Sequence, residues 1–137
     1  MNNVINHFSK RASIYNDTKW VNDVTILSTI LRCAERQSKS FIRILDLGAG
    51  TGAVSKYLLK NYNRNKEIIA MDFCEEMLEQ LNEPQIKKCI ASVDNIPFKD
   101  NSFDIIVSRQ CLHYIENLED VISEIKRVLK KDGIFIL

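Results

Sequence analysis

The chain has 137 residues, of which 45% are hydrophobic and 27% are charged, a balance typical of one soluble globular domain. Its formal net charge of +1 gives no overall basic bias, so we expect no nucleic-acid partner. No apolar run approaches the length needed to cross a bilayer, so no membrane span is expected.

Neither the cysteines nor the N-terminus indicates a metal site or an export signal. The four cysteines lie far apart and form no CxxC pair, which is the usual zinc or redox spacing. The opening stretch MNNVINHFSKR is polar and has no apolar signal core. We therefore expect a cytoplasmic protein with reduced cysteines and no bound metal.

The N-terminal part of the chain is predicted to be helical. Apolar residues recur at helical spacing from Val4 to Arg36, with a break near the stretch YNDT, which predicts two helices. A short polar linker, QSKS, follows at residues 37–40. The sequence therefore divides into an N-terminal helical segment, residues 1–40, and a main domain, residues 41–137.

The main domain alternates short apolar runs with helical segments. The predicted strands are residues 42–47, 67–72, 85–91, 103–108 and a last strand that begins at Ile134. Apolar residues at helical spacing predict three helices in this domain. One follows the first strand, one covers residues 75–82, and one runs from Ile115 to Leu129 and stops at Lys131-Asp132-Gly133. Continuously apolar strands that alternate with helices predict an α/β fold, with a parallel sheet covered on both faces.

The stretch ILDLGAGTGA, residues 44–53, ends the first strand and opens the next helix. Three of the four glycines of the chain, Gly48, Gly50 and Gly52, fall in it. Glycine adopts backbone angles that other residues avoid and removes side chains that would block a ligand. Gly52 and Ala53 would also let the helix lie close to the strand. Because ligands of open α/β sheets bind at the carboxyl ends of strands, the loop is predicted to hold a ligand against bare backbone.

Two classes of ligand fit this loop. GAGTGA satisfies the dinucleotide pattern GxGxxG/A, and Asp72 lies about 20 residues further on, where a ribose-binding acid is expected. Asp46, at the end of the strand, would repel a pyrophosphate and attract an ammonium group of a ligand. The loop alone therefore leaves an NAD-dependent oxidoreductase open as an alternative.

Four stretches in this order carry a family resemblance: ILDLGAGTGA, AMDFCEEML, ASVDNIPFKDNSFDIIVSRQCLHYI and EIKRVLKKDGIFIL. They resemble the class I S-adenosylmethionine-dependent methyltransferases, in the small-molecule branch that includes ubiquinone/menaquinone C-methyltransferases and the malonyl-carrier-protein O-methyltransferase. The resemblance implies a Rossmann-like sheet, S-adenosyl-L-methionine as cofactor, S-adenosyl-L-homocysteine as product, and methyl transfer to a small-molecule acceptor. It also implies two strands beyond the fifth, so we expect residues 41–137 to be an incomplete domain and residues 1–40 to cover the active site.

The same resemblance assigns roles to residues at the strand ends. Asp46 and the glycine-loop backbone are expected to hold the methionine moiety, and Asp72 to accept hydrogen bonds from both ribose hydroxyls. Phe73 and Met77 either pack against adenine or belong to the core. The full predicted cofactor set is Asp46, Gly48, Ala49, Gly50, Gly52, Asp72, Phe73, Met77, Ser92, Val93, Asp94, Ser108 and Arg109.

The sequence departs from the family pattern after the third strand, where the family usually has a Gly-Asp pair. Ala91 and Ser92 occupy these places here. Adenine recognition is therefore expected from Ser92, from backbone groups near Val93, or from Asp94 after a shift of the loop.

No catalytic residue is assigned from the sequence; the candidates are Tyr15, His113 and Tyr114. The sulfonium of the cofactor already activates the methyl group, so positioning of the reactants can supply much of the catalysis. A chain that lacks the last strands could instead be a non-catalytic fragment that binds the cofactor and self-associates through its open sheet edge.

Overall fold

The computed structural model describes residues 23–109 and 115–137. Its centre is a parallel sheet of five strands in the order β3-β2-β1-β4-β5. The strands are β1 (Phe41–Leu47), β2 (Asn65–Asp72), β3 (Ile86–Ile90), β4 (Phe103–Ser108) and β5 (Leu129–Ile136). The predicted α/β class and the parallel, Rossmann-like sheet are confirmed.

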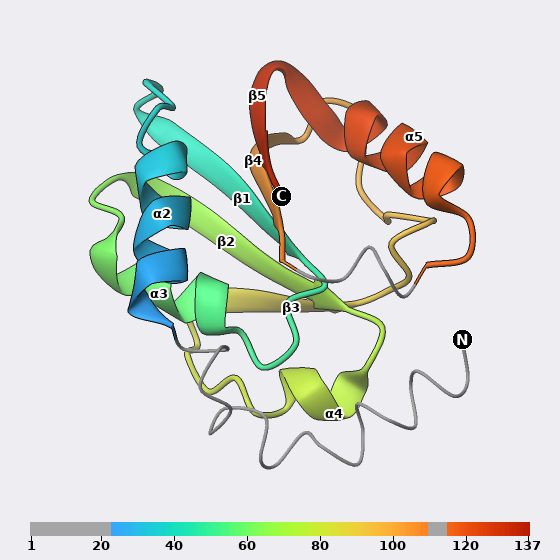
Figure 1. Cartoon of the computed structure of the whole chain (residues 1–137), viewed down its shortest axis with the longest axis horizontal. Coiled ribbons are helices and arrows are strands. Elements are labelled where there is room, and N and C mark those ends of the chain that lie inside the picture. The colour runs from blue at the N-terminus through green and yellow to red at the C-terminus, as the bar shows by residue number, and fades with distance from the viewer. Residues whose placement is uncertain (1–22, 110–114) are drawn as a thin grey trace.

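Helices cover both faces of this sheet (Figure 1). They are α2 (Val24–Ala34), α3 (Ala53–Asn61), the single turn α4 (Glu75–Leu78) and α5 (Leu118–Val128). Buried residues of α2 and α3 pack with Ile44 and Ile105 in one hydrophobic cluster. Buried residues of α5 pack with Leu45 and Ile106 in a second cluster. Neighbouring residues of the central strands thus face opposite layers, which is why those strands are apolar throughout.

The N-terminal helical segment is described from Asp23 onward. Asp23 caps α2, because its carboxylate accepts hydrogen bonds from the N–H groups of Thr25 (2.9 Å) and Ile26 (3.4 Å). Within the described ranges, no helix is both long and apolar enough to span a membrane.

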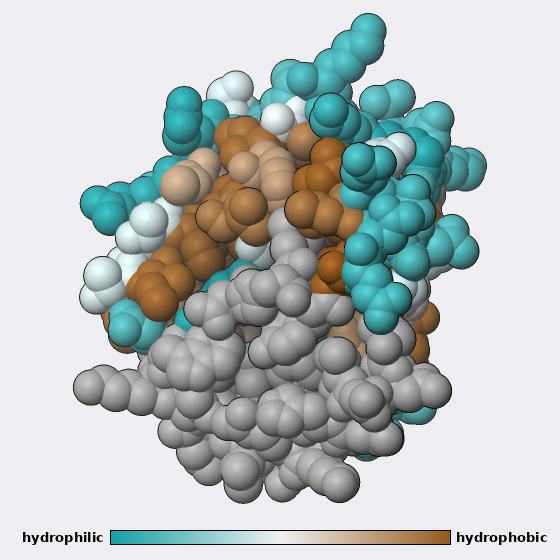
Figure 2. Space-filling model, turned by 45° about the vertical axis from the view of Figure 1, so that its right-hand side comes forward, coloured by the Kyte–Doolittle hydropathy of each residue, from teal (hydrophilic) through white to brown (hydrophobic). Residues whose placement is uncertain are grey.

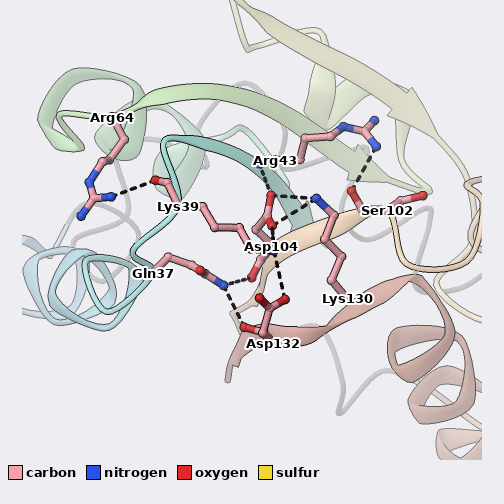
Figure 3. Close-up of polar contacts among 8 residues, drawn as sticks. All are labelled: Gln37, Lys39, Arg43, Arg64, Ser102, Asp104, Lys130 and Asp132. Carbon is pink, nitrogen blue, oxygen red and sulfur yellow. Dashed lines mark hydrogen bonds and ion pairs between the residues drawn. The ribbon is translucent and has the colours of Figure 1, made fainter.

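A cluster of polar residues joins the beginnings of β1, β4 and β5 to the chain segment before β1 (Figure 3). This Asp104 cluster consists of Gln37, Lys39, Arg43, Asp104, Lys130 and Asp132. The buried Asp104 carboxylate accepts hydrogen bonds from the Arg43 N–H (2.8 Å), the Lys39 Nζ (3.0 Å) and the Lys130 Nζ (3.2 Å). Gln37, only 5% exposed, donates from Nε2 to the carbonyls of Asp104 and Asp132. The predicted linker is therefore held against the amino-terminal ends of the strands.

The boundary between the last helix and the last strand differs from the prediction. Helix α5 ends at Val128 and β5 begins at Leu129, whereas the pattern placed Leu129 in the helix and the strand start at Ile134. Phe103 of β4 pairs with Leu129 of β5, and Ile105 of β4 pairs with Ile134 of β5. Between these two pairs β5 therefore contains more residues than β4. The extra residues of β5 form an irregularity that brings Lys130 to Asp104, so contacts distant in sequence decide this boundary.

The predicted helix of residues 75–82 is also shorter than its pattern. The pattern covers residues 75–82, but α4 ends at Leu78. After α4 the backbone hydrogen bonds reach back three residues instead of four, which makes a tighter turn. The Gln80 N–H donates to the Met77 carbonyl, and the Leu81 N–H donates to the Leu78 carbonyl. Leu81 is thereby turned into the core, with an exposed fraction of 1%.

Candidate functional site

The glycine loop lies where the carboxyl ends of β1, β2 and β4 meet. Leu47, the last residue of β1, is aligned with Met71 of β2 and with Ser108 of β4. The N–H groups of Gly48 and Ala49 both donate to the Met71 carbonyl at 2.9 Å. Gly48, Gly50 and Gly52 have φ angles of 74°, 59° and 86°, in the left-handed region that disfavours residues with a Cβ. The loop therefore requires glycine for its backbone conformation.

Gly52 has a packing role as well. A Cβ placed on Gly52 would lie 2.7 Å from Leu81 Cδ1. The close approach that we predicted for Gly52 thus occurs against the side chain that follows α4, rather than against the strand. Gly52 allows the first turn of α3 to pack over Leu81.

Asp72 ends β2 and holds the glycine loop in place. One carboxylate oxygen accepts the Gly50 N–H at 2.8 Å, and the other accepts the Cys74 N–H at 2.9 Å. Burial raises the pKa of Asp72, while the N–H groups of Cys74, Gly50 and Phe73 oppose the rise. Each oxygen keeps a further acceptor site, so this fixed carboxylate can also accept hydrogen bonds from a ligand.

Asp46 lies at the end of β1, 2% exposed, and is bound by the first turn of α3. Its Oδ2 accepts the Ser55 hydroxyl at 2.6 Å and the Ser55 N–H at 3.1 Å. Burial raises the pKa of Asp46 to about 6, and the charge of Asp72 acts in the same direction. The two bonds from Ser55 and the charge of Arg109 act against this rise.

The predicted adenine side lies beyond the ends of β2 and β3. The Ala91 N–H donates to the Asp72 carbonyl at 3.1 Å, so the loop after β3 begins beside Asp72. In that loop Val93 is buried, Ser92 is half-buried and Asp94 is exposed.

Two of the predicted cofactor residues, Phe73 and Met77, pack with Cys74. Phe73 is half-buried in this small apolar cluster, and Met77 is 2% exposed. Packing of Met77 within the cluster favours the core role that the sequence left open for it.

Ser108 and Arg109 belong to the described part of the chain, whereas the catalytic candidates do not. Ser108 is buried and Arg109 is half-buried at the end of β4, beside the end of β1. Tyr15, His113 and Tyr114 lie outside the described residues. Among the residues that are described, no group of three or more His, Cys, Asp or Glu side chains could hold a metal ion.

A cleft of about 350 Å³ adjoins this site, between α2 and the ends of β4 and β5. Its lining comprises Thr25, Ile26, Thr29, Ile30, Cys33, Val107, Ser108, Arg109, Ile136 and Leu137. Figure 2 shows apolar side chains gathered on one face of the molecule, with hydrophilic residues around them.

Two parts of the site were not predicted from the sequence: this cleft, and Ser55. The cleft could have been suspected from Val24 and Ile26, which continue the apolar content of α2 onto its exposed side. Ser55 had a local signal too, because a hydroxyl in the first turn of a helix often satisfies a polar partner near the helix terminus.

Residues 45–137, more than half of the chain, match the family model described as a methyltransferase domain. The chain belongs to the class I S-adenosylmethionine-dependent methyltransferases. S-adenosyl-L-methionine is therefore the cofactor of its family, in agreement with the resemblance. The described part of this methyltransferase domain contains the strand-end carboxylates and the glycine loop in the predicted places.

Three similar proteins illustrate the relationship. The uncharacterized methyltransferase YcgJ of Bacillus subtilis is 33% identical over 95% of this chain and 52% of its own length. Human mitochondrial arginine-hydroxylase NDUFAF5 is 36% identical over 72% of this chain and 28% of its own length. The crystal structure of a Methanococcus maripaludis protein, named as a candidate S-adenosyl-L-methionine-dependent methyltransferase, is 28% identical, with a TM-score of 0.80 over 93% of this chain and 61% of that protein. The chain thus spans 52% and 28% of the two curated relatives and 61% of the crystallised protein, which is less than two thirds of each.

Proposed function

We propose that this chain binds S-adenosyl-L-methionine at the glycine loop, and that the protein transfers the methyl group to a small-molecule acceptor. The observation that carries the proposal is the anchoring of the Gly50 N–H to the Asp72 carboxylate. That bond fixes an acidic acceptor beside a loop in which three glycines adopt left-handed backbone angles. A nucleoside can approach such a loop closely while its ribose hydroxyls donate to the carboxylate.

The residues present fit the chemical groups of this cofactor. Asp72 would accept hydrogen bonds from the ribose hydroxyls, and Asp46 would face the ammonium group of the methionine moiety. The loop that contains Ser92, Val93 and Asp94 would meet the adenine, with Phe73 beside it. Since Val93 is buried in the second hydrophobic cluster, its backbone rather than its side chain would serve the ligand.

The bound cofactor supplies an activated methyl group on its sulfonium, and the protein supplies positioning. Asp46, Asp72 and the loop would hold the cofactor rigidly, while Ser108 and Arg109 would separate it from the acceptor. Positioning of this kind can contribute as much as about 7–11 kcal/mol to lowering a barrier. Direct chemical roles for Tyr15, His113 or Tyr114 remain predictions.

The apolar cleft between α2 and the ends of β4 and β5 supports a small-molecule acceptor with an apolar part. It borders Ser108 and Arg109, the residues proposed to lie between cofactor and acceptor. Residues 1–40 would complete the cover of this cleft, since α2 already forms one of its walls. The human relative is named for arginine hydroxylation, so the relatives do not share one named reaction and the acceptor has to be found by experiment.

Parallel calorimetric titrations of the chain with S-adenosyl-L-homocysteine and with NAD test the proposed cofactor. We expect binding of S-adenosyl-L-homocysteine and no comparable binding of NAD. Preferential binding of NAD would overturn the proposal in favour of an oxidoreductase, which the GAGTGA pattern also permits.

Transfer of an isotope-labelled methyl group to compounds of a cell extract then tests the activity. Cofactor binding without any labelled product would favour a non-catalytic binding module.

A further inference from the structure

Ser55 makes an unusual double contact with the buried Asp46. Its hydroxyl and its backbone N–H both donate to the same carboxylate oxygen, Oδ2, at 2.6 and 3.1 Å. The hydroxyl distance lies within the range of about 2.5–2.7 Å that is usual for bonds from O–H to a charged oxygen. Ser55 is itself fully buried, so water cannot replace this contact readily.

The contact joins the end of β1 to the start of α3 across the glycine loop. Gly52 occupies the N-cap position of α3 and has no side chain that could bind the free N–H groups of the first turn. Asp46 supplies an acceptor for one of them from the neighbouring strand. Because Ser55 holds Oδ2 by two bonds, rotation of the Asp46 carboxylate is restricted.

Among the described residues, the other oxygen of Asp46 has no hydrogen-bond donor. Oδ1 accepts no hydrogen bond from residues 23–109 or 115–137. The loop that leads from Asp46 to Ser55 is the predicted site of the cofactor. A carboxylate whose one oxygen is fixed by the protein can direct the other oxygen toward a cationic group with little loss of freedom on binding.

The charge of Asp46 depends on a balance among the groups that face it. Burial raises its pKa to about 6, and Asp72 at the end of β2 adds to the rise. Ser55 in α3 and Arg109 after β4 favour the charged form. The carboxylate therefore loses its charge as the pH falls through this value, and its attraction for a cation is present above it.

We propose that Ser55 is a positioning residue for the cofactor: it orients Asp46 and keeps it charged, so that the carboxylate can receive the ammonium group of the methionine moiety. The inference rests on the proposed function, because that function supplies the ligand with the ammonium group. Ser55 acts through Asp46 and makes no contact with the ligand in this arrangement.

The first test uses the free protein and needs no cofactor. Carbon-13 NMR of the side-chain carboxyls, with Asp46 assigned by Asp46→Asn, follows the titration of Asp46 in the wild type and in two variants. Ser55→Ala removes the hydroxyl and should raise the pKa of Asp46, whereas Ser55→Thr keeps a hydroxyl and should restore it. An unchanged titration of Asp46 in Ser55→Ala would overturn the inference.

The second test measures the affinity for S-adenosyl-L-homocysteine from acidic to mildly alkaline pH. At neutral pH Ser55→Ala should bind S-adenosyl-L-homocysteine about two- to tenfold more weakly than the wild type. The affinity should recover at higher pH, where Asp46 is charged even in the absence of the Ser55 hydroxyl. A loss of affinity that is equal at every pH would show a merely structural role and would overturn the inference. Ser123→Ala, on the exposed face of α5, is the matched control.

The two tests separate the inference from the proposed function. A wild-type protein that binds no S-adenosyl-L-homocysteine at any pH would refute the proposed cofactor site, while the NMR titration would still decide how Ser55 acts on Asp46. Should Ser55→Ala not fold, Ser55→Cys provides a weak donor of similar size for the same comparison.

Discussion

Asp72 holds the glycine loop and is also proposed to bind the ribose of the cofactor. Its position about 20 residues after the glycine loop predicts a ribose-binding acid. The structure adds that the same carboxylate binds the Gly50 and Cys74 N–H groups. A substitution at this position therefore changes the loop as well as the ligand contact, and the choice of variant matters.

We expect Asp72→Asn to weaken S-adenosyl-L-homocysteine binding by more than tenfold, which corresponds to about 1.4 kcal/mol. The amide keeps one acceptor for the backbone but loses the charge that strengthens bonds from the ribose hydroxyls. Isothermal calorimetry gives the affinity, and near-ultraviolet circular dichroism checks the fold. Glu79→Gln, an exposed acid just after α4, is the control. An unchanged affinity of Asp72→Asn would remove the ribose assignment.

Gly52 provides a stability prediction for the same loop. Gly52→Ala should lower the free energy of unfolding by about 1–3 kcal/mol, because a Cβ is disfavoured at this backbone angle and would also contact Leu81. Urea unfolding measures the change. An exposed replacement such as Ser123→Ala should stay within about 0.5 kcal/mol of the wild type. Equal stability of Gly52→Ala and wild type would mean that the loop adapts to a side chain.

The positions of the loop glycines and of the strand-end acids Asp46 and Asp72 could be predicted, because the sequence signal for them is local. The glycine pattern and the strand-end acids depend on short spacing and on the rule that ligands meet the carboxyl ends of strands. The position of Ser55 in the first turn of α3 suggested a polar partner, but the identity of that partner, Asp46, could not be predicted, because it depends on how α3 lies over β1. Neither could the partner of Gly52, since Leu81 reaches it only after α4 ends early.

Among the secondary-structure elements, β5 shows how tertiary contacts override a local pattern. Leu129 continues the apolar spacing of α5, which is why the sequence places it in the helix. Its backbone instead pairs with Phe103, and Lys130 binds the carboxylate of Asp104. The succession of the strands along the chain and their parallel direction were predictable from periodicity, whereas this boundary depends on a cluster assembled from four segments.

The Asp104 cluster should make stability depend on pH. Burial alone would raise the pKa of Asp104, but the Arg43 N–H, Lys39 and Lys130 outweigh it and lower this pKa. A carboxyl group with a lowered pKa stabilises the fold above its ordinary value, and this contribution is lost as the pH falls. Asp104→Asn should therefore cost about 1.5–3 kcal/mol at neutral pH, and less below about pH 4.

Urea unfolding of Asp104→Asn and wild type at neutral and acidic pH measures this difference. Asp132→Asn is a matched control, because the Asp132 side chain is 66% exposed and its ion pair with Lys39 is open to solvent. A difference between Asp104→Asn and wild type that did not shrink in acid would show that the charge of Asp104 is not what stabilises the cluster.

Across the molecule as a whole, ligand binding and folding should be coupled. The candidate site is built from the ends of β1, β2 and β4 together with α3, so a bound cofactor would contact elements that are adjacent only in the folded state. At a ligand concentration 100 times the dissociation constant, S-adenosyl-L-homocysteine should stabilise the fold by about 2.7 kcal/mol. Thermal unfolding with and without ligand measures this effect, and NAD at the same concentration should produce none.

In the described part of the sheet β5 is an edge strand, and this leads to a prediction about assembly. Among the described residues β5 pairs with β4 alone, and Leu137 beside its end is 79% exposed. Unpaired strand edges favour association between chains, and a charged residue at the edge opposes it. Sedimentation velocity should show a mass that rises with concentration, and Leu137→Lys should reduce that rise. A constant mass for the wild type would indicate that the edge does not self-associate.

The two groups of buried carboxylates lie at opposite ends of the parallel strands. Asp104 and its partners fasten the beginnings of β1, β4 and β5, whereas Asp46 and Asp72 lie at the carboxyl ends of β1 and β2. Substitutions in the cleft proposed to take the acceptor are thus far from the contacts that tie the sheet together. Such a division would allow new acceptors to be acquired over evolutionary time, or by directed evolution, with little risk to the integrity of the scaffold.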